Sequence, residues 1–351
     1  MASNTQEHFL IVLHGAIGDV VRGSSLIPRL RKAYPDCKIT WAVEPLSFPI
    51  VKAMSGIDQV VLFNRGQGFS AYYSFIKELR KNKYTCVLDL QRHFKSGITS
   101  FLSGGKKRIG FNRKNAKEFN WIFSTNKIPV VDNFSSKIKH YHLFLDTLGL
   151  PTQQIYTFPF VRNNETEQSL ENRLSQLSTI DLQPKNQRAV LIVGSSWKSR
   201  FWFVEHYQKL IKKLWEEKNI QSIIIGGKGE RLFVDHILQN IPVGSTIDLV
   251  EKTSLVDLFS LFNIVSFAVG SDSGPMHIAS AVSCPVVSLW GATSYLRSAP
   301  YGSESYVLQS PVGCSPCYRR ECPGLGQICM EDLSPEIVFA QINRLLVSQN
   351  R

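Results

Sequence analysis

Short apolar runs alternate with amphipathic stretches along the whole chain. The runs have the length and β-branched content of buried strands, and the stretches between them carry apolar residues three and four apart, the helical period. The runs are residues 9–13, 38–43, 60–63 and 85–90 in the first half, and 189–194, 222–227, 264–270 and 285–291 in the second. This alternation of strand and helix predicts parallel sheets covered by helices.

A polar segment at residues 163–187 separates the two sets of strands. After it, helices are expected at residues 203–219 and 231–241. A chain of 351 residues that is 43% hydrophobic can bury more than one core. We therefore expect an α/β protein with two Rossmann-like domains, at residues 1–165 and 186–351, in which ligands bind at the carboxyl ends of the strands.

The charge balance favours an anionic partner. There are 40 Lys and Arg residues against 28 Asp and Glu, a net charge of +12, which suits a nucleic acid, a phosphate-bearing substrate or an acidic membrane surface. Neither an RNP-type aromatic motif nor a helix-turn-helix pattern accompanies the charge, so we expect no nucleic acid. No apolar segment reaches the ~18 residues of a membrane span, and the first residues do not resemble a signal peptide, so a cytoplasmic location is expected.

The first predicted strand leads into a turn with Gly15, Gly18 and Asp19. The spacing is not GxGxxG, and Glu44 is the only acid near the end of the second strand, which disfavours a dinucleotide site. Asp19 has two interpretations. It is a helix-capping or first-turn acid, or it is a general base that deprotonates an acceptor hydroxyl, provided that its surroundings raise its pKa toward neutrality.

A second strand-to-helix turn, Asp272-Ser273-Gly274-Pro275, follows the strand at 264–270. Proline suits a first helical position, and the free N–H groups of a helix start bind phosphate. Gly274 would let a diphosphate approach the backbone, Ser273 would add a hydroxyl donor, and Asp272 would cap the helix or orient a ligand hydroxyl. His277 in the first helical turn faces either the phosphate or the core.

Basic residues of the first domain form a candidate anion-facing surface, with an ordinary solvated surface as the alternative. They are Arg22, Arg92, Lys95, Lys106, Lys107, Arg108 and Arg113. Arg92 and Lys95 follow the strand at 85–90, where a ligand of a parallel sheet lies, so they would suit a phosphorylated acceptor.

Four of the seven cysteines crowd near the C-terminus, at Cys314, Cys317, Cys322 and Cys329. Four thiolates can hold Zn or Fe, but the last two spacings lack the paired C-x2-C of a zinc ribbon. The alternative is a set of reduced thiols that pack within a loop, as befits a reducing compartment.

The stretches GSDSGPMHIASA (270–281) and CPVVSLWG (284–291) resemble the signature of the ADP-heptose:lipopolysaccharide heptosyltransferases, glycosyltransferase family 9. The stretch LHGAIGDVV (13–21) resembles the other signature of that family, and IDQVVLF, DLQRHFKS and KRIGF resemble its intervening blocks. The resemblance covers nearly the whole chain. It implies a GT-B fold, with parallel sheets facing a central cleft, an acceptor-binding first domain and a nucleotide-sugar-binding second domain. The implied reaction is inverting, metal-independent transfer of L-glycero-D-manno-heptose from ADP-heptose to the lipopolysaccharide inner core.

By the same resemblance, Asp19 with its neighbour Gly18 matches the position of the catalytic base, and Asp272 that of a donor-contacting aspartate. Ser273, Gly274 and His277 would lie beside the diphosphate. Glu230 matches an acid near the adenosine ribose. A family lysine that neutralises the departing ADP has no direct counterpart in SSWKSRFWF, where Arg200 or Lys198 would take its place.

The expected acceptor-binding residues are Arg22, Arg92, Lys95 and Arg113. Lys106, Lys107, Arg108 and Arg113 are expected to contact the anionic cytoplasmic face of the inner membrane. No cofactor is expected for catalysis, and a structural Zn or Fe would be held by the cysteine cluster. Three alternatives remain: another nucleotide sugar, a protein acceptor, and a non-catalytic nucleotide-sugar-binding protein.

Overall fold

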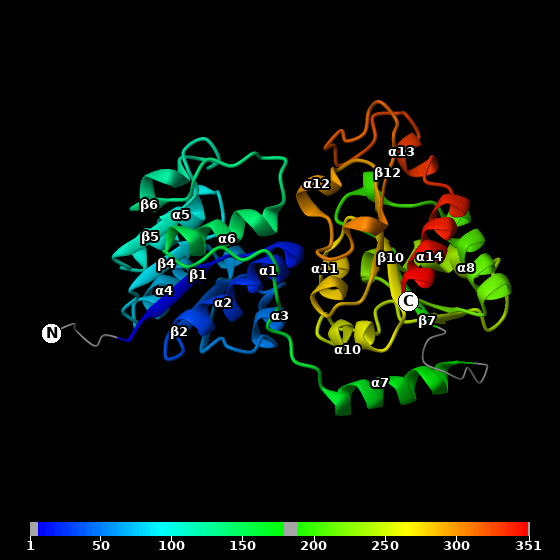
Figure 1. The fold of residues 1–351 in the computed structure, drawn as a ribbon, viewed down its shortest axis with the longest axis horizontal. Coiled ribbons are helices and arrows are strands. Elements are labelled where there is room, and N and C mark those ends of the chain that lie inside the picture. Colours follow the sequence, from blue (N-terminus) through cyan, green and yellow to red (C-terminus); the bar gives the residue numbers. More distant parts are fainter. Residues whose placement is uncertain (1–5, 179–187, 350–351) are drawn as a thin grey trace. The chain divides into compact units, whose positions relative to one another are not determined.

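The computed structural model describes residues 6–178 and 188–349, which divide between Val161 and Arg162 into two compact units (Figure 1). Each unit contains one parallel six-stranded sheet. Over the described ranges, no helix combines the length and apolarity that a bilayer crossing requires.

The sheet of the first unit has the strand order β3-β2-β1-β4-β5-β6. Its strands are β1 (His8–Val12), β2 (Lys38–Val43), β3 (Gln59–Leu62), β4 (Cys86–Asp89), β5 (Lys107–Gly110) and β6 (Asn126–Lys127). The order reverses between β1 and β4, which pair in parallel with Val12 opposite Asp89. Both strands therefore end at the same edge, the position where doubly wound sheets bind ligands.

Helices connect these strands and cover the sheet. They are α1 (Ile17–Ser24), α2 (Leu26–Ala33), α3 (Phe48–Lys52), α4 (Gly68–Leu79), α5 (Phe94–Leu102) and α6 (Lys137–Thr147), with 3₁₀ turns η1 (Arg65–Gln67) and η2 (Asn120–Phe123). Strand β1 is fully buried along its length, as its apolar sequence HFLIV requires for a central strand of a two-sided sheet.

The second unit repeats this topology, with the order β12-β11-β10-β7-β8-β9. Its strands are β7 (Arg188–Ile192), β8 (Gln221–Ile225), β9 (Thr246–Asp248), β10 (Phe267–Ser271), β11 (Val286–Trp290) and β12 (Val307–Gln309). Here the order reverses between β7 and β10, which pair in parallel. The loops after these two strands therefore form the corresponding ligand-binding edge.

The helices of the second unit are α7 (Asn164–Leu177), α8 (Val204–Lys218), α9 (Arg231–Leu238), α10 (Asp257–Asn263), α11 (Gly274–Ala281), α12 (Tyr295–Ser298), α13 (Ile328–Glu331) and α14 (Pro335–Gln349), with η4 (Lys198–Arg200), η5 (Lys228–Glu230) and η6 (Glu304–Tyr306). Helix α8 shows why they pack: it buries Tyr207, Leu210, Ile211 and Leu214 in the core. Each side chain so buried contributes about 1.5–3 kcal/mol.

The described part of the polar segment between the two sets of strands forms a helix. Helix α7 begins after Asn163, whose side chain accepts the N–H of Thr166, and it buries Leu170 and Leu174. This helix belongs to the second unit. Residues 179–187 lie outside the described residues.

The eight predicted strands and both predicted helices are confirmed, with ends displaced by up to three residues. The α/β class with two Rossmann-like units is therefore as predicted. The sequence pattern missed β5, β6, β9 and β12, which are two to four residues long. Such short strands carry too few residues to show an apolar run.

Candidate active site

In the first unit, the candidate site lies where β1 and β4 end. After Val12 the chain passes through Leu13 to Ala16 and enters α1, which places Asp19 in the first helical turn. The Asp19 N–H donates to the Ala16 carbonyl at 2.9 Å. Gly18 is buried in the same turn. The turn thus fixes Asp19 beside the carboxyl end of a central strand, as predicted for this motif.

Two cations hold the carboxylate of Asp19. The Arg22 guanidinium donates to Oδ1 at 2.6 Å, and the Lys137 ammonium donates to Oδ1 and Oδ2 at 2.8 and 3.2 Å. Arg22 comes from the same helix, whereas Lys137 is the first residue of α6. Arg22, predicted to bind an acceptor, is therefore a partner of Asp19.

The sequence interpretation of Asp19 as a base required surroundings that raise its pKa, and the structure shows the opposite. Burial alone would raise the pKa of Asp19, but the charges and hydrogen bonds of Lys137 and Arg22 outweigh burial and hold it well below its usual range. The expectation that the surroundings raise this pKa toward neutrality is wrong for the described arrangement. Asp19 is ionised, and so able to accept a proton, at every pH near neutrality.

The end of β4 contributes a buried hydrogen-bond network. Burial raises the pKa of Asp89 to about 7, although its carboxylate accepts from Asn120 at 2.8 Å, Ser96 at 3.2 Å and the Gln91 N–H at 3.1 Å. The Gln91 side chain then donates to the Gly15 carbonyl at 3.1 Å. The network therefore ties the end of β4 to the turn that carries Asp19.

The other predicted acceptor-binding cations have separate surroundings. Arg92 follows β4, donates to Asn133 at 2.8 Å and lies over the Phe111 ring at 4.6 Å. Lys95 is exposed on α5. Arg113 lies 5.1 Å over the Trp121 ring. Their assignment to an acceptor stays a prediction.

In the second unit, the loops after β7, β10 and β11 meet at Asp272. The Arg200 guanidinium lies 3.3 Å from the Asp272 carboxylate and also donates to its backbone carbonyl at 3.2 Å. Thr293 donates to the carboxylate at 2.9 Å, and Ser195 donates to the carbonyl at 2.8 Å. Asp272 is not the cap of α11, because Ser273 holds the N-cap position.

The two candidate cations in this unit are placed differently. Arg200 stacks 3.9 Å over the Trp197 ring and is largely buried, and this burial lowers its pKa while Asp272 opposes the shift. Lys198 is 82% exposed and pairs with Glu321 at 3.5 Å. Of the two, Arg200 is the one that reaches the predicted donor-binding aspartate.

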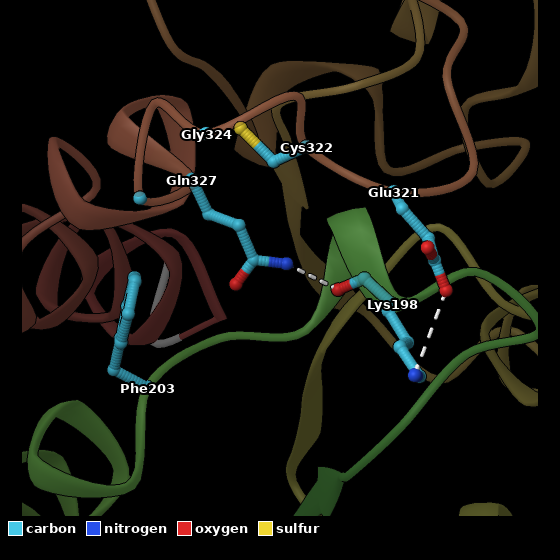
Figure 2. Close-up of a pocket in the computed structure, with 7 residues that line it drawn as sticks. Lys198, Phe203, Glu321, Cys322, Gly324 and Gln327 are labelled. Carbon is cyan, nitrogen blue, oxygen red and sulfur yellow. Dashed lines mark hydrogen bonds and ion pairs between the residues drawn. The ribbon is translucent and has the colours of Figure 1, made fainter.

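Lys198 lines a separate pocket of about 520 Å³ (Figure 2). Figure 2 shows the Lys198 side chain directed at Glu321. The Gln327 amide donates to the Lys198 backbone carbonyl at 2.5 Å. The remaining lining residues are Phe203, Cys322, Gly324 and Gly326. None of the residues lining this pocket belongs to the turn at Asp272, so the pocket is distinct from that site.

The start of helix α11 presents hydrogen-bond donors without acceptors. Ser273 is the N-cap, Gly274 and Pro275 open the helix, and His277 is buried in it. The Ser273 hydroxyl and Nε of Arg200 are buried, and neither has a hydrogen-bond partner among the described residues. Buried donors in native proteins are nearly always paired, so this turn suits a ligand rich in acceptor oxygens.

Glu230 lies over the end of β7. Its carboxylate accepts the N–H of Gly227 at 2.7 Å. Gly194 has a φ angle of 91°, which side chains rarely allow. A Cβ at Gly194 would also lie 2.3 Å from the Glu230 side chain. Glycine is needed at this position for both reasons, and Glu230 is thereby held at the same sheet edge as the Asp272 turn.

The four C-terminal cysteines are near one another but are not arranged as metal ligands. Burial is the main cause that raises the pKa of Cys329, and the other three thiols add to it. Within residues 6–178 and 188–349, however, no three His, Cys, Asp or Glu side chains are grouped to hold a metal ion. As placed, the predicted Zn or Fe ligands do not fit a metal, and no chemical step is assigned to one.

Three residues that hydrogen-bond to the predicted aspartates were not predicted from the sequence. Lys137 lies 118 residues from Asp19, in a stretch without a recognisable motif. Thr293 follows the strand motif SLWG by two residues, and Ser195 directly follows the end of a predicted strand. Position after a strand end signalled the last two, whereas nothing local signalled Lys137.

Comparison with known proteins gives consistent matches. The sequence profile described as glycosyltransferase family 9 (heptosyltransferase) matches residues 72–327. The lipopolysaccharide core heptosyltransferase OpsX of Haemophilus influenzae is 25% identical over 301 residues, which cover 84% of this chain and 81% of that protein.

Two solved structures share the fold. A family 9 glycosyl transferase from Veillonella parvula superposes with a TM-score of 0.82 at 18% identity, covering 97% of each chain. The heptosyltransferase WaaC of E. coli with ADP gives a TM-score of 0.78 at 20% identity, covering 96% of this chain and 99% of that one. The predicted fold class, GT-B type with two Rossmann-like domains, is confirmed.

Proposed function

The chain belongs to glycosyltransferase family 9, the heptosyltransferases, and from this premise we propose that it transfers L-glycero-D-manno-heptose from ADP-heptose to the lipopolysaccharide inner core. The observation that carries the proposal is the pair of unpartnered buried donors, Ser273 Oγ and Arg200 Nε, at the turn that opens α11. A diphosphate supplies the acceptor oxygens that these donors and the helix N-terminus lack.

The second unit holds the donor in this proposal. The amides at the start of α11 and the Arg200 guanidinium bind the diphosphate, and Asp272 orients Arg200 through their 3.3 Å contact. Glu230, held at the same sheet edge, accepts from a ribose hydroxyl. As the glycosidic bond breaks, negative charge develops on the departing ADP, and fixed cationic and dipolar groups stabilise it most at that moment.

The first unit holds the acceptor. Its hydroxyl oxygen attacks the anomeric carbon, the bond from that carbon to the ADP oxygen breaks, and the bonding pair leaves with ADP. The hydroxyl proton passes to the Asp19 carboxylate. This carboxylate is ionised because the positive charges of Lys137 and Arg22 stabilise its negative charge. Attack opposite the departing group inverts the anomeric centre.

The charge and the acceptor together suggest where the reaction occurs. A lipopolysaccharide precursor is anchored in a bilayer, and the chain carries +12. We propose that the enzyme works at the cytoplasmic face of the inner membrane through peripheral contact with anionic lipid. ADP-heptose and the lipid-linked core are its two substrates.

A transfer assay tests this function. The protein is incubated with ADP-heptose and a heptose-deficient core acceptor, and a mass gain of one heptose on the acceptor is expected. The Asp19→Asn variant should lower turnover by about two to four decades while donor binding is retained. Asp36→Asn, which changes an exposed aspartate of the same unit, is the matched control.

Three results would each overturn part of the assignment. Transfer only from another nucleotide sugar, or only to a protein acceptor, would reject the proposed substrates. Full activity in Asp19→Asn would remove Asp19 from the role of base, while leaving the substrates as proposed.

A further inference from the structure

Large apolar side chains are exposed on two adjoining elements of the first unit, α5 and the turn η2. Phe94 and Phe101 on α5 are 42% and 52% exposed, and Phe119 and Ile122 at η2 are 71% and 53% exposed. Phe94 and Phe101 are seven residues apart, which places them on one side of the helix. We refer to these four residues as the α5–η2 face. Helix α5 lies beside β5 in this unit (Figure 1).

Ring packing and hydrogen bonds hold α5 and η2 together. The Phe123 ring contacts Phe94 and Phe101, with ring centroids 5.2 and 6.1 Å apart. Fully buried Asn120 fastens η2 to α5 by donating to the His93 carbonyl at 2.9 Å and to Asp89. At Gly97 a Cβ would meet Phe123 at 2.5 Å, so only glycine lets η2 lie this close to the helix.

The backbone at this face is held in an unfavourable conformation that exposes an aromatic ring. Glu118 and Phe119 have φ angles of 50° and 58°, in the left-handed region that non-glycine residues avoid. Phe119 nevertheless has the most exposed side chain of the face. Strain of this kind tends to be retained at functional sites. Burial cannot explain the position of Phe119, so a surface role is the better explanation.

The segment that carries the α5–η2 face is strongly basic. Residues 92–127 contain nine basic residues and a single acidic one, Glu118. The basic residues are Arg92, Lys95, Lys106, Lys107, Arg108, Arg113, Lys114, Lys117 and Lys127. Arg108 lies 5.4 Å over the Phe101 ring, and Glu118 is turned to the start of α5, where it accepts the Phe94 N–H at 3.1 Å. The basic excess of the whole chain is therefore concentrated here.

We propose that the α5–η2 face docks on an anionic lipid bilayer, with the aromatic side chains in the interface and the basic residues of segment 92–127 against the headgroups. Exposed aromatic residues in a segment rich in Lys and Arg have the composition of interfacial binding surfaces. A second copy of this chain fits poorly, because two such faces would bring like charges together. The inference rests on the proposed function, since an enzyme whose acceptor is anchored in lipid must bind that acceptor at the bilayer surface.

Vesicle sedimentation tests the proposal. The full chain is mixed with vesicles of phosphatidylglycerol and phosphatidylethanolamine or of phosphatidylcholine alone. We expect co-sedimentation with the anionic vesicles at low salt and release near half-molar salt, where the Debye length falls to a few ångströms. Phe119→Ser with Ile122→Ser should weaken binding to anionic vesicles about tenfold or more, and Lys106→Glu with Lys114→Glu and Lys117→Glu should abolish it.

Phe69→Ser with Val243→Ser is the matched control, because both residues are exposed apolar side chains outside this face. The control should bind as the unchanged protein does. Equal binding to neutral and anionic vesicles would overturn the proposal. So would unchanged binding by the Phe119/Ile122 variant, or a dimer in solution that this variant dissociates.

Activity assays separate this inference from the proposed function. The Phe119/Ile122 variant should retain transfer to a soluble, delipidated core acceptor and lose most transfer to the acceptor embedded in anionic vesicles. If the unchanged protein transfers to neither acceptor yet binds vesicles through this face, the proposed function fails and the docking surface stands. If the variant transfers equally well to both acceptors, the docking surface fails and the function stands.

Discussion

At the scale of single residues, the ion pairs of Asp19 are the strongest chemical feature of the first unit. A carboxylate between two cations is ionised at neutral pH but weakly basic. Lys137 lies on α6, whereas Asp19 lies on α1. An anionic group of the acceptor that attracted the Lys137 ammonium would therefore weaken the ion pair between Lys137 and Asp19. Acceptor binding would then raise the basicity of Asp19 at the moment when a base is needed.

The pH profile of Lys137→Met tests this coupling. Without the Lys137 charge, burial and the remaining Arg22 decide the pKa of Asp19, which should rise by about 1–3 units. The ionised form of Asp19 is the active one, and it is lost as pH falls through the pKa. The acidic limb of kcat/KM should therefore move to higher pH by a similar amount, which initial-rate measurements from neutral pH down to the lowest pH at which circular dichroism shows an intact fold would detect.

Two further variants make the result specific. Lys137→Arg keeps a cation and should keep the acidic limb low, and Lys139→Met removes an exposed lysine of the same helix without effect. An acidic limb that stays in place in Lys137→Met, with the fold intact by circular dichroism, would contradict the coupling.

At the scale of elements, the cysteine-rich segment supports the turn that carries Arg200. Ser199, buried in the middle of η4, donates through its N–H to the Arg320 carbonyl at 3.1 Å and through its hydroxyl to the Arg319 carbonyl at 2.6 Å. Gln327 donates to the Lys198 carbonyl. The segment thus fixes η4, and η4 sets Arg200 against Asp272.

Removing one of these hydrogen bonds should weaken ADP binding. Ser199→Ala deletes the hydroxyl that holds η4, and a buried hydrogen bond contributes about 0.5–1.5 kcal/mol, so the Kd for ADP should rise by up to about tenfold in calorimetry. Ser245→Ala is the control, because its buried hydroxyl also donates to a carbonyl, that of Pro242, at 2.6 Å. Asp272→Ala should also weaken ADP binding, because Arg200 loses its carboxylate partner.

If Ser199→Ala and Ser245→Ala lower the melting temperature alike and neither changes the Kd, then Ser199 has only a structural role. Selective loss of ADP affinity in Ser199→Ala is the result that identifies a positioning role.

The sequence was informative where a structure depends on local pattern. Buried strands such as β1 and β2 were predicted because their apolar runs are long enough to recognise. Edge strand β6 has two exposed residues and offers no such pattern. Likewise the Gly18-Asp19 turn could be recognised, whereas its partner Lys137 could not, because α6 meets α1 only in the folded unit. The choice between Lys198 and Arg200 also needed the structure, since both are cations of one 3₁₀ turn.

At the scale of the whole molecule, the same topology serves two tasks. Each unit places a strand-to-helix turn at the point where its strand order reverses, with Asp19 in one and Asp272 in the other. Both aspartates are paired with arginine, at 2.6 and 3.3 Å. Positive charge supplied by the chain is thus present at both sites, which suits two anionic substrates.

This distribution of charge leads to the last prediction, that transfer proceeds without a divalent metal. The sequence lacks an Asp-x-Asp pair of the kind that chelates Mg²⁺ or Mn²⁺ on a diphosphate. In the proposed mechanism, the start of α11 and Arg200 supply the neutralising charge in its place. Turnover should therefore be unchanged by excess EDTA. Circular dichroism measured in parallel would reveal unfolding if a metal had been removed from the cysteine-rich segment. Loss of transfer with an intact spectrum, restored by Mg²⁺ alone, would show that the diphosphate depends on a metal that the protein charges do not replace.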